Sequence, residues 1–105
     1  MRAWLHTFRD RLTVDVAAHV AAQLPELLRG VYYDGWNPSA VPIKYDRDGY
    51  VNRFAQEAKI APEDVPRTAA AVTSVVREHF SPGALESAVE QLPHGIRDVL
   101  LQPAA

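Results

Sequence analysis

The stretch Thr13–Tyr33, TVDVAAHVAAQLPELLRGVYY, decides the fold, because a related stretch occurs 68 residues later in the same chain. The second stretch is SPGALESAVEQLPHGIRDVL at 81–100, and it aligns with residues 13–32 without a gap. Identical residues include Gln23-Leu24-Pro25 with Gln91-Leu92-Pro93, Arg29 with Arg97, and Val31 with Val99. Apolar positions also agree where the residues differ, as in Val16/Ala84, Val20/Ala88 and Leu28/Ile96. The pattern indicates a duplicated helical unit.

Length and composition favour one globular domain, 1–105. Apolar residues make up 48% of the 105-residue chain and are spread throughout it. No apolar run approaches the roughly 20 residues that a bilayer requires. The first residues, MRAWLHTFRDR, carry charges and hold no apolar signal-peptide core. We therefore expect a cytoplasmic protein without a membrane partner.

The charge balance and the lack of cysteine narrow the function classes. Without cysteine the chain has no disulfide, thiolate metal site or cysteine nucleophile. The net charge is −2 and the basic residues are scattered. Nucleic-acid binding normally needs a basic face, so the sequence disfavours it.

Apolar periodicity and proline punctuation predict seven short helices and no strand. The expected ranges are about 2–12, 14–23, 26–33, 47–59, 65–79, 82–91 and 93–101. The repeat halves, about 2–33 and 65–101, are joined by a loop at 34–45 and the helix at 46–59. The predicted fold is an all-α compact bundle with approximate two-fold internal symmetry.

Local signals set the expected helix ends. Pro25 and Pro93 break the two copies at matching places, and Asp34-Gly35 ends the first. Side chains expected to cap helix N-termini are those of Thr13, Asp46, Asp64 and Ser81. Pro82 would then occupy the first helical position. Residues 102–105 are expected to fray.

The repeat predicts an open slot in the first half. The helix at 65–79 is preceded by a helix at 47–59, whereas its counterpart at 2–12 has no helix before it. The N-terminal helix nevertheless carries an apolar stripe formed by Trp4, Leu5, Phe8 and Leu12. Burial of such side chains contributes about 1.5–3 kcal/mol each. We expect a second copy or a partner helix to cover this stripe, with Trp4 and Phe8 in contact; alternatively, the 34–45 loop folds over it.

The assembled motifs resemble the domain-of-unknown-function 2267 family of small bacterial helical proteins. They are RDRLTVDVAAHVAAQLP…LLRGVYYDGW at 9–36, a Tyr50/Phe54 helix, and SPGALESAVEQLP…IRDVL at 81–100. The resemblance covers nearly the whole chain and implies a helical bundle. Members of the family usually begin with a further helix ahead of the position of Met1, and this sequence departs there. The resemblance implies no activity and no catalytic residue.

Arg29 and Arg97 form the first candidate site. Each arginine lies four residues after its proline, so the pair could hold a carboxylate or phosphate. The alternative is a structural role, because each has an acidic neighbour (Glu26 or Asp98) and lies near a helix end. We favour the structural role.

The aromatic residues Tyr33, Trp36 and Tyr45 form the second candidate site, around the proline-containing loop. Aromatic side chains with a polar tip are enriched at binding surfaces, and loops often carry function. The alternative is that they anchor the loop to the bundle, as Tyr32 is expected to do from within the core.

No pattern favours catalysis, a metal or a cofactor. No two of the histidines, His6, His19, His79 and His94, have the helical spacing of a metal site. The best-placed hydroxyls, Thr13 and Ser81, are already assigned as caps. We predict a non-enzymatic interaction or assembly module that self-associates or binds a helical protein. The alternatives are a small-molecule or anion binder using Arg29, Arg97 and the Tyr33–Trp36 loop, and a nucleic-acid-associated factor.

Overall fold

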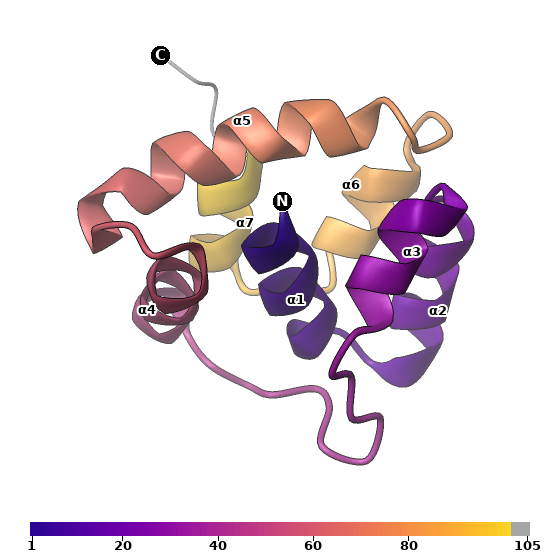
Figure 1. Ribbon diagram of the computed structural model, residues 1–105, viewed down its shortest axis with the longest axis horizontal. Coiled ribbons are helices and arrows are strands. Elements are labelled where there is room, and N and C mark those ends of the chain that lie inside the picture. Colours follow the sequence, from indigo (N-terminus) through magenta and orange to yellow (C-terminus); the bar gives the residue numbers. More distant parts are fainter. Residues whose placement is uncertain (102–105) are drawn as a thin grey trace.

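Seven α-helices and one 3₁₀ turn build the domain in the computed structural model, which describes residues 1–101 (Figure 1). Their bounds are α1 Arg2–Arg11, α2 Val14–Ala22, α3 Glu26–Tyr33, α4 Arg47–Ala58, η1 Pro62–Asp64, α5 Val65–Arg77, α6 Ala84–Val89 and α7 His94–Leu101. No strand occurs within these residues. The radius of gyration is 12.5 Å, close to the roughly 13 Å expected of a compact chain of this length. The all-α prediction is confirmed.

The arrangement of helices follows the sequence repeat in several respects. α3 and α7 begin 68 residues apart, one residue after Pro25 and Pro93. α1 contacts α3 as α5 contacts α7, and α2 lies against α6. Leu24 and Leu92, which precede the two prolines, are both buried. The duplication itself, as a superposition of the two halves, stays a prediction.

α1 is the central helix and is covered on all sides, so the prediction of an open slot is wrong. Figure 1 shows α1 in the middle of the bundle, and it contacts α3, α4 and α5. The stripe residues are fully buried: Trp4, Leu5, Phe8 and Leu12 are each 0% exposed. Trp4 and Phe8 are therefore core residues and not contact residues for a partner. The reason is that α4, which lies between the repeats in sequence, packs against α1 as well as α5 and α7.

Polar residues of α1 join it to its neighbours. The indole Nε1 of Trp4 donates to Thr73 Oγ1 of α5 at 2.9 Å. His6 lies between α3 and α4: its Nε2 is 2.7 Å from the Val31 carbonyl oxygen, and its Nδ1 is 2.5 Å from Glu57 Oε1. A carbonyl oxygen only accepts, so Nε2 is the donor to Val31.

The 34–45 loop is tied to the C-terminal end of α1. The Ile43 N–H donates to the Asp10 carbonyl at 2.7 Å, and Arg11 Nε donates to the Tyr45 carbonyl at 3.2 Å. These bonds satisfy polar groups where a helix end lacks partners of its own. Gly35, with a φ of 74°, supplies the left-handed turn that follows α3. The loop therefore holds the C-terminal end of α1, while α4 covers the side of that helix.

Two of the four predicted caps are confirmed. Thr13 Oγ1 accepts from the Val16 N–H at 3.4 Å, and Asp46 Oδ1 accepts from the Gly49 N–H at 2.9 Å. Asp64 makes no cap hydrogen bond; its carboxylate meets Arg67 at 3.2 Å. A 3₁₀ turn precedes α5 here, and Asp64 already has helical backbone angles. A capping side chain needs an extended backbone, which explains the difference.

The predicted cap at Ser81 is wrong because the chain makes a β-turn there. The Ala84 N–H donates to the Ser81 carbonyl at 3.0 Å, and Gly83 has φ 81° and ψ −11°. These angles are those of a type II turn, with Pro82 and Gly83 at its two central positions. α6 therefore begins at Ala84 and is shorter than predicted. The expected fraying of 102–105 lies outside the described residues.

Candidate functional site

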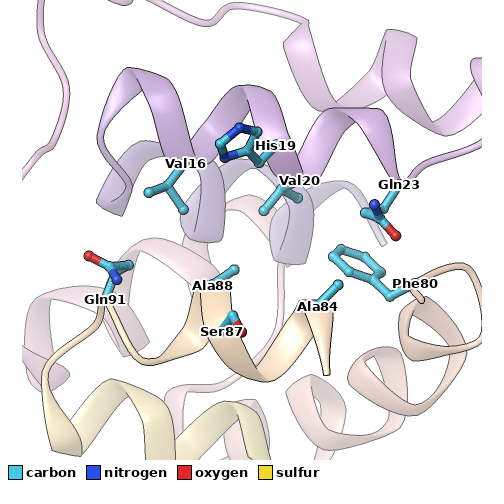
Figure 2. A pocket seen from close by; sticks show the side chains of 9 residues that line it. All are labelled: Val16, His19, Val20, Gln23, Phe80, Ala84, Ser87, Ala88 and Gln91. Atoms are coloured by element: carbon cyan, nitrogen blue, oxygen red, sulfur yellow. The ribbon is translucent and has the colours of Figure 1, made fainter. Parts of the chain in front are cut away.

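A groove of about 340 Å³ runs between α2 and α6 (Figure 2). Its volume is near the lower end of the 300–1,000 Å³ typical of small-molecule sites. Nine side chains from α2, α6 and the adjoining turns line it: Val16, His19, Val20, Gln23, Phe80, Ala84, Ser87, Ala88 and Gln91. We call this the α2–α6 groove.

Most of the lining consists of pairs related by the sequence repeat. Eight of the nine residues form four pairs that are 68 positions apart: Val16/Ala84, His19/Ser87, Val20/Ala88 and Gln23/Gln91. In Figure 2 the valines extend from α2 toward α6, and the alanines extend from α6 toward α2. The groove therefore lies between the two segments that align with each other at a shift of 68 residues.

Differences in side-chain size explain why the two helices leave space between them. The first copy contributes Val16 and Val20, whereas the second contributes Ala84 and Ala88 at the matching places. The alanine side chains do not reach far enough to fill the interface, and close-packed interiors have few such gaps. Phe80 covers one end, next to the turn that precedes α6.

The groove has an apolar floor and a polar rim, and its lining holds no aspartate, glutamate, lysine or arginine; His19 is its one titratable side chain. Val20 and Ala88 are buried in the floor, while His19, Ser87 and Gln91 are exposed at the rim. An ion that reached the floor would lose hydration without meeting a carboxylate, lysine or arginine. The lining thus suits an uncharged, largely apolar group.

Gln23 is the one groove side chain with a fixed hydrogen-bonding role. Its Oε1 accepts from the backbone N–H of Ser81 at 2.9 Å and from the Ser81 hydroxyl at 3.1 Å. A backbone N–H only donates, so the amide oxygen must face Ser81. These bonds tie the end of α2 to the turn before α6 and hold the amide in one orientation.

The predicted arginine pair does not line this groove. Arg29 donates to the carbonyl oxygens of Ala21 and Leu24, each at 3.1 Å, which satisfies the C-terminal end of α2. Arg97 is half-buried, and its Nε atom has no hydrogen-bond partner within residues 1–101. The geometry supports the structural interpretation for Arg29; an anion site formed by both arginines stays a prediction.

The predicted aromatic site is split into two places. Tyr33 and Trp36 have ring centroids 5.1 Å apart, and both are half-buried. Tyr45 instead packs 6.1 Å from the Tyr50 ring, beneath the Arg53 guanidinium. Its hydroxyl donates to the Thr7 carbonyl, and burial raises the pKa of the Tyr45 phenol. Tyr45 therefore anchors the loop, whereas a contact role for Tyr33 and Trp36 stays a prediction.

Two other hollows are more polar, and charged residues line both of them. One, of about 310 Å³ between α1 and α4, is lined by Thr7, Asp10, Arg53, Gln56 and Glu57. Its two carboxylates already pair with Arg9 and His6. The other, of about 420 Å³, is lined by Arg47, Asp48, Val51, Asn52, Pro62, Glu63 and Pro66. Neither combines an apolar floor with an uncharged rim.

Within the described part of the chain, no three acidic or histidine side chains converge as a metal site would require. No helix among residues 1–101 is long and apolar enough to cross a membrane.

At the surface, the Arg2 guanidinium donates to Asp34 at 2.8 Å, and this hydrogen bond holds the pKa of the Asp34 carboxyl below its usual value.

Sequence reasoning did not find the groove, although it identified the residues of its floor as apolar helix positions. The available signal was the replacement of Val16 and Val20 by alanines at the matching positions of the repeat. Alanines facing valines across a predicted helix pair indicate an underfilled interface. That signal is usable only when the pairing of α2 with α6 is known.

Comparison with known proteins identifies the family to which the chain belongs. The sequence profile described as "Uncharacterized conserved protein (DUF2267)" matches residues 1–99. The chain belongs to the DUF2267 family. A comparison with curated proteins found no match. The family resemblance is confirmed, and the profile's description names no activity.

Proposed function

We propose that this DUF2267 domain is a binding domain whose α2–α6 groove takes an uncharged, largely apolar ligand. The observation that carries the proposal is the groove's lining: a buried apolar floor and a polar rim in which His19 is the one titratable side chain. Apolar clefts with a few polar groups at their edges are the common form of small-ligand sites. The proposed role is binding.

A second copy of the chain fits the groove less well than a ligand does. If two copies met symmetrically at this face, each groove would face an identical groove, and the space between them would stay unfilled. Interfaces of stable complexes pack as closely as protein interiors. A concave, pseudo-symmetric face therefore favours a convex occupant of different shape.

Self-association was predicted from the α1 stripe, and that stripe is buried. Elsewhere, the exposed large apolar residues are dispersed over the first residue and three helices: Met1, Val14, Leu27 and Val75. Single exposed apolar residues are normal on a monomer. The groove is thus better supported as the binding surface than α1.

Thermal unfolding in the presence of a compound panel tests the proposal. The panel compares uncharged alcohols, ketones and lactones with carboxylates and amines on the same carbon skeletons. A ligand present at ten times its Kd stabilises the native state by about 1.4 kcal/mol, which raises Tm by about 5 °C or more for a domain of this size. We expect such shifts from uncharged compounds only.

Ser87→Trp supplies the decisive variant, because Ser87 is exposed at the groove rim and an indole there covers the floor. Ser74→Trp is the matched control on the exposed side of α5. Ser87→Trp should abolish the ligand-induced rise in Tm, and Ser74→Trp should retain it. Equal responses of the two variants, or stabilisation by charged compounds alone, would contradict the proposal. A wild-type dimer that Ser87→Trp dissociates would assign the groove to a second copy instead.

A further inference from the structure

We infer that the ligand carries a neutral hydrogen-bond acceptor, such as a ketone, ester or ether oxygen, at the Gln23 end of the α2–α6 groove. This inference rests on the proposed function and adds the chemistry that the groove selects. It comes from the difference between two repeat-related amides, Gln23 and Gln91, which Figure 2 shows at opposite ends of the groove.

The Gln23 amide can offer only its NH₂ group to a ligand. Its oxygen is occupied by both the N–H and the hydroxyl of Ser81, at 2.9 and 3.1 Å. Rotation of the amide by half a turn would place NH₂ against the Ser81 N–H, donor against donor, and is excluded. Gln23 is half-buried, so the direction of its remaining donors is set by the fold. A ligand atom that meets them must accept.

Gln91 makes no such selection. It is exposed, and no hydrogen bond of its side chain is found within residues 1–101. Its amide can turn to present either the oxygen or the nitrogen to a ligand. The groove therefore has one end that requires an acceptor and one end that tolerates either kind of group.

The lining disfavours the two commonest ionised alternatives. A carboxylate would accept from Gln23 but would lose its hydration in a lining that has no lysine or arginine and holds His19 only at the exposed rim. An ammonium group only donates, so it would meet the Gln23 NH₂ as donor against donor. A neutral acceptor on an apolar chain satisfies both the amide and the floor.

Three probes that each contain seven carbon atoms separate these possibilities: 2-heptanone, heptanoate and heptylammonium. Each is titrated into ¹⁵N-labelled protein, with the amide signals of Val16, Val20, Ala84 and Ala88 as the readout. We expect saturable shifts with 2-heptanone, and affinities about fivefold or more weaker for the two ions.

Gln23→Glu is the sharpest variant. A glutamate can still accept from both Ser81 groups, so the turn is retained, but the two NH₂ donors are replaced by a charged oxygen. One neutral hydrogen bond is worth about 0.5–1.5 kcal/mol, so affinity for 2-heptanone should fall about 3- to 10-fold. Heptylammonium should now bind more tightly than it does to the wild type. Gln91→Glu is the matched control, with a change for 2-heptanone of less than about twofold.

The outcomes separate this inference from the proposed function. Saturable ketone binding that Gln23→Glu weakens selectively supports both. Equal binding of all three probes, or equal losses from the two glutamate variants, overturns the acceptor inference and leaves the groove as a binding site. If no probe shifts the groove amides while the spectrum shows a folded protein, both are contradicted.

Discussion

α1 and α5 occupy matching places in the sequence repeat but very different places in the molecule. Every residue of α1 from Ala3 to Arg9 is buried, whereas α5 has an exposed outer face on which Val75 is 48% exposed. Figure 1 shows α1 enclosed by other helices and α5 running across one side of the bundle. Related sequence therefore does not give related surroundings.

The difference arises from the segment between the copies. α4 lies in the chain between the repeats, and in space it packs against α1, α5 and α7. One helix therefore covers the central helix of the first copy and also contacts two helices of the second. The apolar stripe on α1 is larger than its counterpart on α5, as Trp4 and Phe8 match Val72 and Val76. The helix with the bulkier apolar stripe is the one enclosed.

The largest expected effect is at Trp4, compared with its repeat counterpart Val72. Trp4→Ala removes a fully buried indole and its hydrogen bond to Thr73, and should lower the free energy of unfolding by about 3–5 kcal/mol. Val72→Ala, at a half-buried position, should cost less than about 1.5 kcal/mol. Urea denaturation measures both, and similar losses would mean that α1 and α5 are equally buried.

An intermediate effect is expected at His6, whose repeat counterpart is Ser74. His6→Leu keeps the bulk of the side chain but leaves the Val31 carbonyl and Glu57 without their partner. The expected loss of unfolding free energy is about 1–3 kcal/mol, toward the lower value because the Glu57 side chain is 32% exposed. Ser74→Ala should change stability by less than about 0.5 kcal/mol. A neutral His6→Leu would show that the bridge between α3 and α4 contributes nothing to stability.

The smallest expected effect compares Arg29 with Arg97. Arg29→Met removes two hydrogen bonds to the C-terminal carbonyls of α2 and should cost about 0.5–1.5 kcal/mol. Arg97→Met keeps an apolar stem and removes a buried Nε that has no partner within residues 1–101, so its stability should be unchanged or raised. A larger loss for Arg97→Met, measured by the same denaturation, would favour a shared role for the two arginines.

The helices could be predicted from sequence because their signals are local. Pro25, Pro93 and Gly35 interrupt the apolar periodicity at the observed ends, and Thr13 and Asp46 cap as their types suggest. The turn at Ser81 was missed, although a Pro-Gly pair is itself a turn signal. Because Ser81 aligns with the capping residue Thr13, the alignment predicted a second cap at Ser81. Pro82 and Gly83 form a turn there instead.

The surroundings of each helix could not be predicted, because they depend on contacts between distant segments. The enclosure of α1 depends on where α4 packs, and the sequence of α1 does not indicate where that is. The groove likewise depends on Ala84 and Ala88 facing Val16 and Val20, which come from helices 68 residues apart. The selective orientation of Gln23 requires Ser81, a contact that only the folded chain provides.

The most direct test of the account is an isotope-filtered nuclear Overhauser measurement on labelled protein with bound 2-heptanone. The account predicts contacts from the ketone chain to methyl groups on both sides of the groove, those of Val16 and Val20 on α2 and those of Ala84 and Ala88 on α6. Contacts confined to one helix, or to the Tyr33 and Trp36 rings, would contradict it.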